Sequence, residues 1–180
     1  MLGNAINIEN ENADILLDDI MEEFGTDLTI LAFSYVKDIE ASKDIVQTVF
    51  LKCFMHIKGF EKRSSLKTWL YRITVNQCKD YLKSYYIRKI FLTDDTKEQA
   101  TEQTPETITL RKLNDQGIVD HIMSLPKKYR EVLILRFIHE LESKEIAEIL
   151  SVPLDTVKTR IRRAKDKLRP TLKEEYFNEE

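Results

Sequence analysis

Apolar positions recur at spacings of three and four along most of the chain, which is the period of an amphipathic helix. The first such stripe begins near residue 14 and reaches Phe24. Gly25 and Thr26 then interrupt the pattern, and a second helix is predicted over residues 28–36. No stretch shows the strict alternation of a half-buried strand, so the pattern predicts an all-α protein.

A polar turn leads into a third helix, for which Ser42 or Asp44 can act as the N-cap and Gly59 as the terminator. A short polar loop is expected over residues 60–66. A long helix is then predicted over residues 67–89.

The helical pattern stops after residue 92 and returns at residue 118, near the start of a further helix. Pro126 suits the first turn of the next one. Two more helices are predicted over residues 144–150 and 154–172, and Pro170 can interrupt the last. The expected fold has two small helical domains, over residues 14–92 and 118–173, joined by a flexible linker over residues 93–117. An acidic tail is expected at each end, over residues 1–13 and 174–180.

Charge changes this picture, because a net charge of −3 conceals two basic blocks. Residues 28–92 hold 12 bases and 5 acids, and residues 118–173 hold 13 bases and 8 acids. Two such blocks suggest two modules that each face a polyanion. The chain shows no apolar run long enough for a membrane span and no secretory signal, and its two cysteines make no disulfide framework, so we expect a cytoplasmic protein.

The clearest functional signal lies in the last predicted helix. An apolar stripe formed by Val157, Ile161, Ala164 and Leu168 must face the preceding short helix. The other faces carry mainly basic and hydroxyl side chains, and we assign DNA contacts to Thr156, Lys158, Thr159, Arg160, Arg162 and Arg163. Two short helices with a basic second one predict a helix-turn-helix that enters the major groove. The alternative is a basic, solvated helix in an ordinary bundle.

Aromatic and basic side chains alternate over residues 60–89, and this mixture suits single-stranded nucleic acid. Aromatic rings stack on unpaired bases, while cations follow the phosphates. The alternative is that Trp69 belongs to the core and the bases form a solvated face.

At this point the chain resembles the extracytoplasmic-function class of RNA polymerase sigma factors. Residues 44–50 (DIVQTVF) resemble its polymerase-docking helix, and residues 68–73 (TWLYRI) with Asn76 resemble its promoter-melting segment. Motifs spread over residues 125–164 resemble its second domain, although Glu142 stands where a capping Ser is common. These motifs occur in the family's order and spacing over nearly all of residues 14–172.

The resemblance implies that the chain binds the coiled coil and flap of core RNA polymerase, opens the minus-ten element and reads the minus-thirty-five element as duplex. It also implies an anti-sigma factor as a partner. The polymerase contacts fall on Asp44, Gln47 and Phe50. The minus-ten contacts fall on Phe60, Lys62, Arg63, Trp69, Asn76, Lys79 and Lys83. The minus-thirty-five contacts fall on the residues assigned above.

Two other function classes remain open: a helix-turn-helix regulator with an N-terminal sensor domain, and a polymerase-binding adaptor. Catalysis is not expected, because His56, His121 and His139 lack nucleophilic partners at motif spacing. Cys53 and His56 are three residues apart, but a zinc site needs about four ligands, so we expect no metal and no cofactor.

Overall fold

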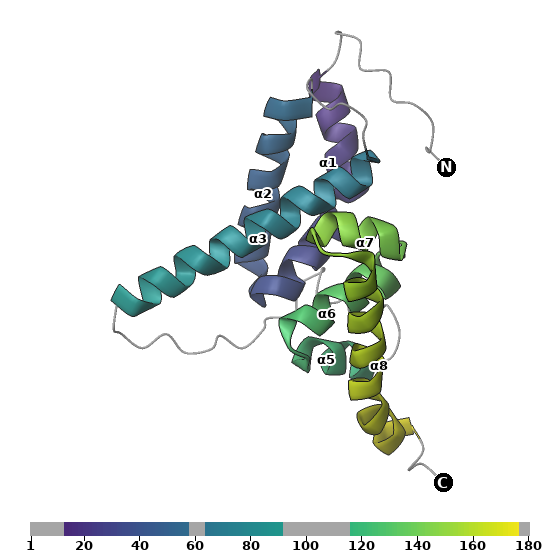
Figure 1. The fold of residues 1–180 in the computed structure, drawn as a ribbon. Helices are drawn as coiled ribbons and strands as arrows, with labels where there is room; N and C mark the ends of the chain where they lie inside the picture. The colour runs from purple at the N-terminus through teal and green to yellow at the C-terminus, as the bar shows by residue number, and fades with distance from the viewer. Residues whose placement is uncertain (1–12, 58–63, 92–115, 177–180) are drawn as a thin grey trace.

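The computed structural model describes residues 13–57, 64–91 and 116–176, and it is helical almost throughout (Figure 1). The described helices of the first half are α1 (Ala13–Val36), α2 (Ile39–His56) and α3 (Leu66–Phe91). Those of the second half are α5 (Gln116–Ser124), α6 (Lys127–Leu133), the π-helical turn η2 (Ile134–Ile138), α7 (Ser143–Leu150) and α8 (Leu154–Tyr176). No strand occurs within these ranges, which confirms the all-α fold class.

Helix α1 runs unbroken through Gly25 and Thr26, so the predicted interruption is wrong. Glycine in a helix costs about 1 kcal/mol relative to alanine. The apolar stripe continues across the glycine and buries Phe24 before it and Leu28 after it in the sequence. Burial of these two side chains outweighs the cost of the glycine. Gly25 therefore weakens the helix without ending it.

The N-cap of α2 is Asp38, and neither Ser42 nor Asp44 takes that place. An Asp38 carboxylate oxygen accepts a hydrogen bond from the Ala41 N–H at 2.9 Å. Ser42 lies in the first turn, where its hydroxyl bonds to the Asp38 carbonyl. The predicted terminator, Gly59, lies outside the described residues.

Further boundaries differ from the sequence-based ones. Gln116 and Gly117 already belong to α5, and α8 continues through Pro170 to Tyr176, so residues 174–176 are helical and not part of a tail. Pro126 is the N-cap of α6 and stands just before its first turn. Ala13 of the predicted tail begins α1, Leu66 of the predicted loop begins α3, and Ser64 and Ser65 precede α3. The remaining residues of the tails, the linker and the loop lie outside the described residues.

Helices α1, α2 and α3 pack against one another, and α5 to α8 form a second group beside them (Figure 1). The core of the first group contains Leu31, Val49 and Leu70, all fully buried. The second is built around buried Val132, Ile146 and Val157. These buried residues form one continuous cluster across both groups. Beyond that contact, α3 extends away from the rest of the molecule, and the side chains of residues 83–86 are exposed.

Candidate nucleic-acid interface

The helix-turn-helix is formed by α7 and α8, which pack directly on each other. Val157, Ala164 and Leu168 are buried and Ile161 is half-buried, which confirms the predicted stripe. Because this face of α8 is committed to the core, the described charged residues Lys158, Arg162 and Arg163 lie on its exposed faces.

A left-handed residue shapes the turn between these helices. Ser151 has φ 56° and ψ 48°, and the Val152 N–H bonds to the Ala147 carbonyl at 3.1 Å. This is the Schellman geometry, which satisfies carbonyls at the end of α7. At the other end, Glu142 accepts from the backbone of Glu145 while the Glu145 carboxylate accepts from the Glu142 N–H at 2.8 Å. Glu142 therefore replaces the more common capping serine in a complete capping box.

The exposed side of α8 carries Lys158, Arg162 and Arg163, all solvent-accessible. Thr156 and Thr159 are half-buried beside them. A hollow of about 390 Å³ lies along this side, and its lining is Lys128, Tyr129, Asp155, Thr156, Thr159, Arg160 and Arg163. Sequence reasoning missed Lys128, whose only signal was its place in the basic second half of the chain.

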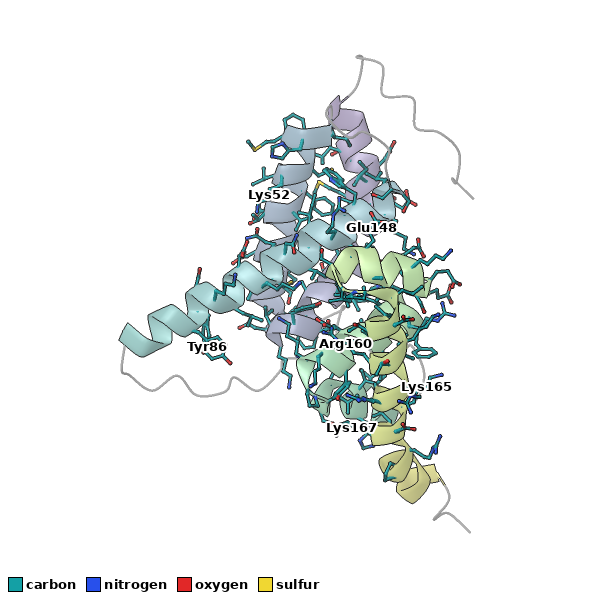
Figure 2. The ribbon with its side chains drawn as sticks, viewed as in Figure 1. Lys52, Tyr86, Glu148, Arg160, Lys165 and Lys167 are labelled. Atoms are coloured by element: carbon teal, nitrogen blue, oxygen red, sulfur yellow. The ribbon has the colours of Figure 1, made fainter. Side chains whose placement is uncertain are left out.

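Arg160 differs from its neighbours because it is paired within the protein (Figure 2). Its guanidinium lies 2.9 Å from a carboxylate oxygen of buried Glu131 on α6. Only about a quarter of the Arg160 side chain is exposed. To contact a phosphate, the Arg160 guanidinium must therefore leave the Glu131 carboxylate or bind both groups at once.

On α3, the candidate minus-ten residues divide by exposure. Asn76 and Lys83 are exposed and Lys79 is half-buried, at spacings of three and four that place them along one side of the helix. Trp69 is half-buried and packs against the core. It therefore contributes to packing whatever else it contacts. Phe60, Lys62 and Arg63 lie outside the described residues.

On α2, Asp44 and Gln47 are exposed, but Phe50 is buried at 6% exposure. Phe50 therefore packs in the core of this structure, and its assignment to the polymerase contact stays a prediction. The side of α2 that carries Asp44 and Gln47 also exposes Leu51, Phe54 and Met55. Helical spacing from Asp44 could have revealed this apolar extension.

The two cysteines are buried within the helical cores. Burial raises the pKa of the Cys53 thiol to about 11 and that of Cys78 to about 12. Both thiols are therefore protonated at neutral pH and poor nucleophiles. Within the described ranges no three His, Cys, Asp or Glu side chains gather as metal ligands. Across the same ranges, no helix has the length and apolar character of a membrane span.

Two family models match the chain in the same order as the helical groups. Sigma-70 region 2 matches residues 20–86, and Sigma-70 region 4 matches residues 116–168. The first match contains the exposed sides of α2 and α3, and the second contains the helix-turn-helix.

Curated proteins and solved structures agree with these matches. The chain is 32% identical over 165 residues to the ECF RNA polymerase sigma factor SigW of Bacillus subtilis, covering 87% of this chain and 88% of that protein. It is 33% identical over 132 residues to the ECF RNA polymerase sigma-E factor of Escherichia coli, covering 68% and 69%.

Among solved structures, the fold is similar to RpoE of Bartonella quintana in complex with the anti-sigma factor NepR. The TM-score is 0.66 at 22% identity, over 87% of this chain and 98% of that one. It is also similar to CnrH in complex with the cytosolic domain of CnrY, with a TM-score of 0.63 at 21% identity over 88% of each chain.

Two helical modules, with a helix-turn-helix in the second, define a transcription initiation factor built from sigma regions 2 and 4. The chain belongs to the extracytoplasmic-function group of the sigma-70 family. It is therefore an alternative sigma factor, a non-enzymatic protein that binds core RNA polymerase and promoter DNA and directs transcription initiation.

Proposed function

We propose that the three exposed surfaces divide the work of initiation between them. The exposed side of α2 docks on the coiled coil of the polymerase's largest subunit. The side of α3 with Asn76, Lys79 and Lys83 holds the opened minus-ten strand, and α8 reads the minus-thirty-five duplex. The observation that supports this proposal most strongly is that α8 has a buried apolar stripe on one face and exposed cations on its other faces.

The α8 assignment is tested with Arg163→Ala in polymerase holoenzyme on a promoter found by transcript profiling. A base-reading arginine contributes about 1–3 kcal/mol of discrimination, so initiation should fall roughly 5- to 150-fold on the cognate element and less on altered ones. Lys37→Gln, an exposed cation between α1 and α2, is the matched control. If Arg163→Ala kept the promoter preference of the wild type, the assignment of sequence recognition to α8 would be wrong.

The α2 assignment is tested by capture of core polymerase with the double variant Asp44→Ala/Gln47→Ala. Exposed polar contacts of this kind contribute about 1–3 kcal/mol when desolvated in an interface, so affinity should fall at least several-fold. Asp120→Ala, an exposed acid on α5, should bind as the wild type. Unchanged affinity of the double variant would rule out this surface.

The α3 assignment rests on Asn76, whose side-chain amide both donates and accepts hydrogen bonds, as recognition of an extruded base requires. Asn76→Ala should spare polymerase capture and impair opening, measured by fluorescence of a base analogue in the minus-ten element. The defect should shrink on a pre-melted template. An equal defect on duplex and bubble would indicate general single-strand affinity instead.

Two further parts of the proposal concern context. The similar structures were solved with the anti-sigma factor NepR and with the cytosolic domain of CnrY, which supports an anti-sigma factor as a partner of this chain. We place the chain in the cytoplasm, where core polymerase and promoter DNA are found.

A further inference from the structure

Two tyrosines near the end of α3 are exposed, and the proposed function gives neither of them a role. Tyr85 is 40% exposed and Tyr86 is 65% exposed. Both lie on the part of α3 that extends away from the rest of the molecule, and Tyr86 projects from it into solvent (Figure 2). The fold gains little from a ring that stays in water, so core packing does not explain Tyr86.

Tyr86 lies on the side of α3 that is proposed to hold the opened minus-ten strand. It ends a stripe of residues at helical spacings of three, four and three, which are Asn76, Lys79, Lys83 and Tyr86. At 1.5 Å per residue, Tyr86 stands about 15 Å beyond Asn76 along the helix. This α3 stripe has an amide at one end, cations in the middle and an aromatic ring at the other end.

The Tyr86 ring has an aromatic neighbour that helps to hold it in place. The ring centroids of Tyr85 and Tyr86 are 6.4 Å apart and their planes meet at 79°, which is an edge-to-face pair. Whichever ring contributes its edge, this contact leaves at least one face of the Tyr86 ring uncovered. A free ring face is what a stacked base requires.

The charges along the α3 stripe suit a strand of nucleic acid. Between Asn76 and Tyr86 the helix carries Lys79 and Lys83 against one acid, Asp80, so this segment is positive by one charge. Surfaces that bind single strands combine cations that follow the phosphates with exposed aromatic rings on which bases stack. Base pairs in a duplex cover one another's faces, so only an unpaired base can stack fully on such a ring.

We propose that Tyr86 is a stacking platform for one unpaired base of the opened minus-ten strand, while Lys79 and Lys83 contact the phosphates between that base and the base at Asn76. At the stacked spacing of 3.4 Å, 15 Å corresponds to about four nucleotides. The platform rests on the proposed role of α3 and extends that site by about three helical turns. Because the contact exists only when the strand is unpaired, it favours the open complex over the closed one.

The test measures binding of assembled holoenzyme to a single-stranded oligonucleotide that carries the minus-ten element of a promoter found by transcript profiling. Tyr86→Ala should bind roughly 5- to 150-fold more weakly, which is the contribution of one stacked base. Tyr86→Phe keeps the ring and should bind as the wild type. Alanine favours a helix and Tyr86 is exposed, so both variants should fold. A duplex that ends upstream of the minus-ten element should bind all three proteins alike.

An abasic scan of the same oligonucleotide locates the stacked base. With the wild type, removal of one base about four nucleotides from the base at Asn76 should cost the same factor as Tyr86→Ala. At that position Tyr86→Ala should lose nothing further, because the ring and the base are partners and their losses do not add. The same scan with Asn76→Ala identifies the base held by Asn76.

Phe137→Ala is the matched control. Phe137 is also an aromatic residue beside a lysine, 52% exposed with the Lys165 ammonium 4.9 Å from its ring centroid, but it belongs to η2. Assembled holoenzyme with this variant should bind the single strand as the wild type does.

Wild-type affinity of Tyr86→Ala would overturn the platform, and so would an equal loss in Tyr86→Phe, which would assign the contact to the hydroxyl. If Asn76→Ala lost affinity while Tyr86→Ala did not, the platform alone would be wrong. If neither variant lost affinity, the proposed role of α3 would be wrong as well. A loss in Tyr86→Ala alone would support the platform and remove the role proposed for Asn76.

Discussion

His139 shows how one buried side chain can make stability depend on pH. Burial lowers its pKa to about 4, and the Lys67 ammonium acts in the same direction while the Asp27 carboxylate opposes it. Tyr71 is the other titratable group in contact, and burial raises the pKa of its hydroxyl. The imidazole is therefore neutral in the folded protein at physiological pH, and its Nε2 has no hydrogen-bond partner among the residues that the structure describes.

Stability should fall as the pH decreases from about 6.5 towards 4, because within that window the unfolded chain binds a proton that the folded chain does not. The stabilisation is fully present above the unfolded pKa. The loss at pH 5.5 should be about 1–1.5 kcal/mol. Urea unfolding at pH 7.5 and 5.5 measures it, and His139→Gln should lose this share of the pH dependence.

His56→Gln provides the comparison, since His56 is exposed on α2. It should retain the pH dependence of the wild type. If His139→Gln and the wild type lost equal stability on acidification, another group would account for the effect.

At the scale of the element, the α7–α8 turn contains a residue type that its backbone does not favour. Ser151 adopts a left-handed conformation that costs a residue with a Cβ about 1 kcal/mol, whereas glycine adopts it freely. Ser151→Gly should therefore raise the free energy of unfolding by about 0.5–1 kcal/mol, measured by urea denaturation.

Ser151→Ala separates this effect from loss of the hydroxyl, because alanine keeps the Cβ in the left-handed conformation. It should give no comparable gain. Equal shifts for the glycine and alanine variants would show that backbone strain at this turn is not relieved by the change.

Helix existence was predictable from sequence because the apolar stripes of α2, α3 and α8 are long and regular. Helix boundaries were less predictable, since each depends on which of several nearby residues makes the capping contact. Ser42 and Asp44 are sound capping types, yet Asp38 comes first and its carboxylate reaches the Ala41 N–H. At Gly25, burial of neighbouring side chains outweighed a propensity penalty that sequence reasoning took as decisive.

The candidate site was predictable where the helix period alone decides exposure, as for Lys158 and Arg163 on α8. It was not predictable where partners lie far apart in the chain. Tyr35 and Glu131 are separated by 96 positions, and Tyr71 and His139 by 68. No local pattern encodes such a pair, so the pairing of Arg160 and the burial of His139 emerge only from the folded chain.

At the scale of the whole molecule, an acidic protein should bind DNA through a locally basic surface. The net charge is −3, yet α8 exposes Lys158, Arg162 and Arg163 together. Binding to any duplex of fixed length should weaken with salt, because phosphate contacts release counterions. If Arg162 meets one phosphate, Arg162→Ala should make the slope of log K against log salt shallower by about 0.9.

Lys37→Gln serves as the control, since this exposed cation lies outside the helix-turn-helix. Its slope should equal that of the wild type. A slope unchanged by Arg162→Ala would show that this side chain does not neutralise a phosphate, whatever its exposure.

The carboxylate of Glu131 lies where α1, α6 and α8 meet. It accepts from Arg160 with one oxygen and from Tyr35 with the other, so a phosphate that draws Arg160 away leaves a buried negative charge without its cation. A phosphate at α8 and the Glu131 carboxylate are therefore competing ligands of one guanidinium. Thermodynamic reciprocity then requires that the Arg160–Glu131 pair weaken this phosphate contact by the same factor by which the phosphate weakens the pair.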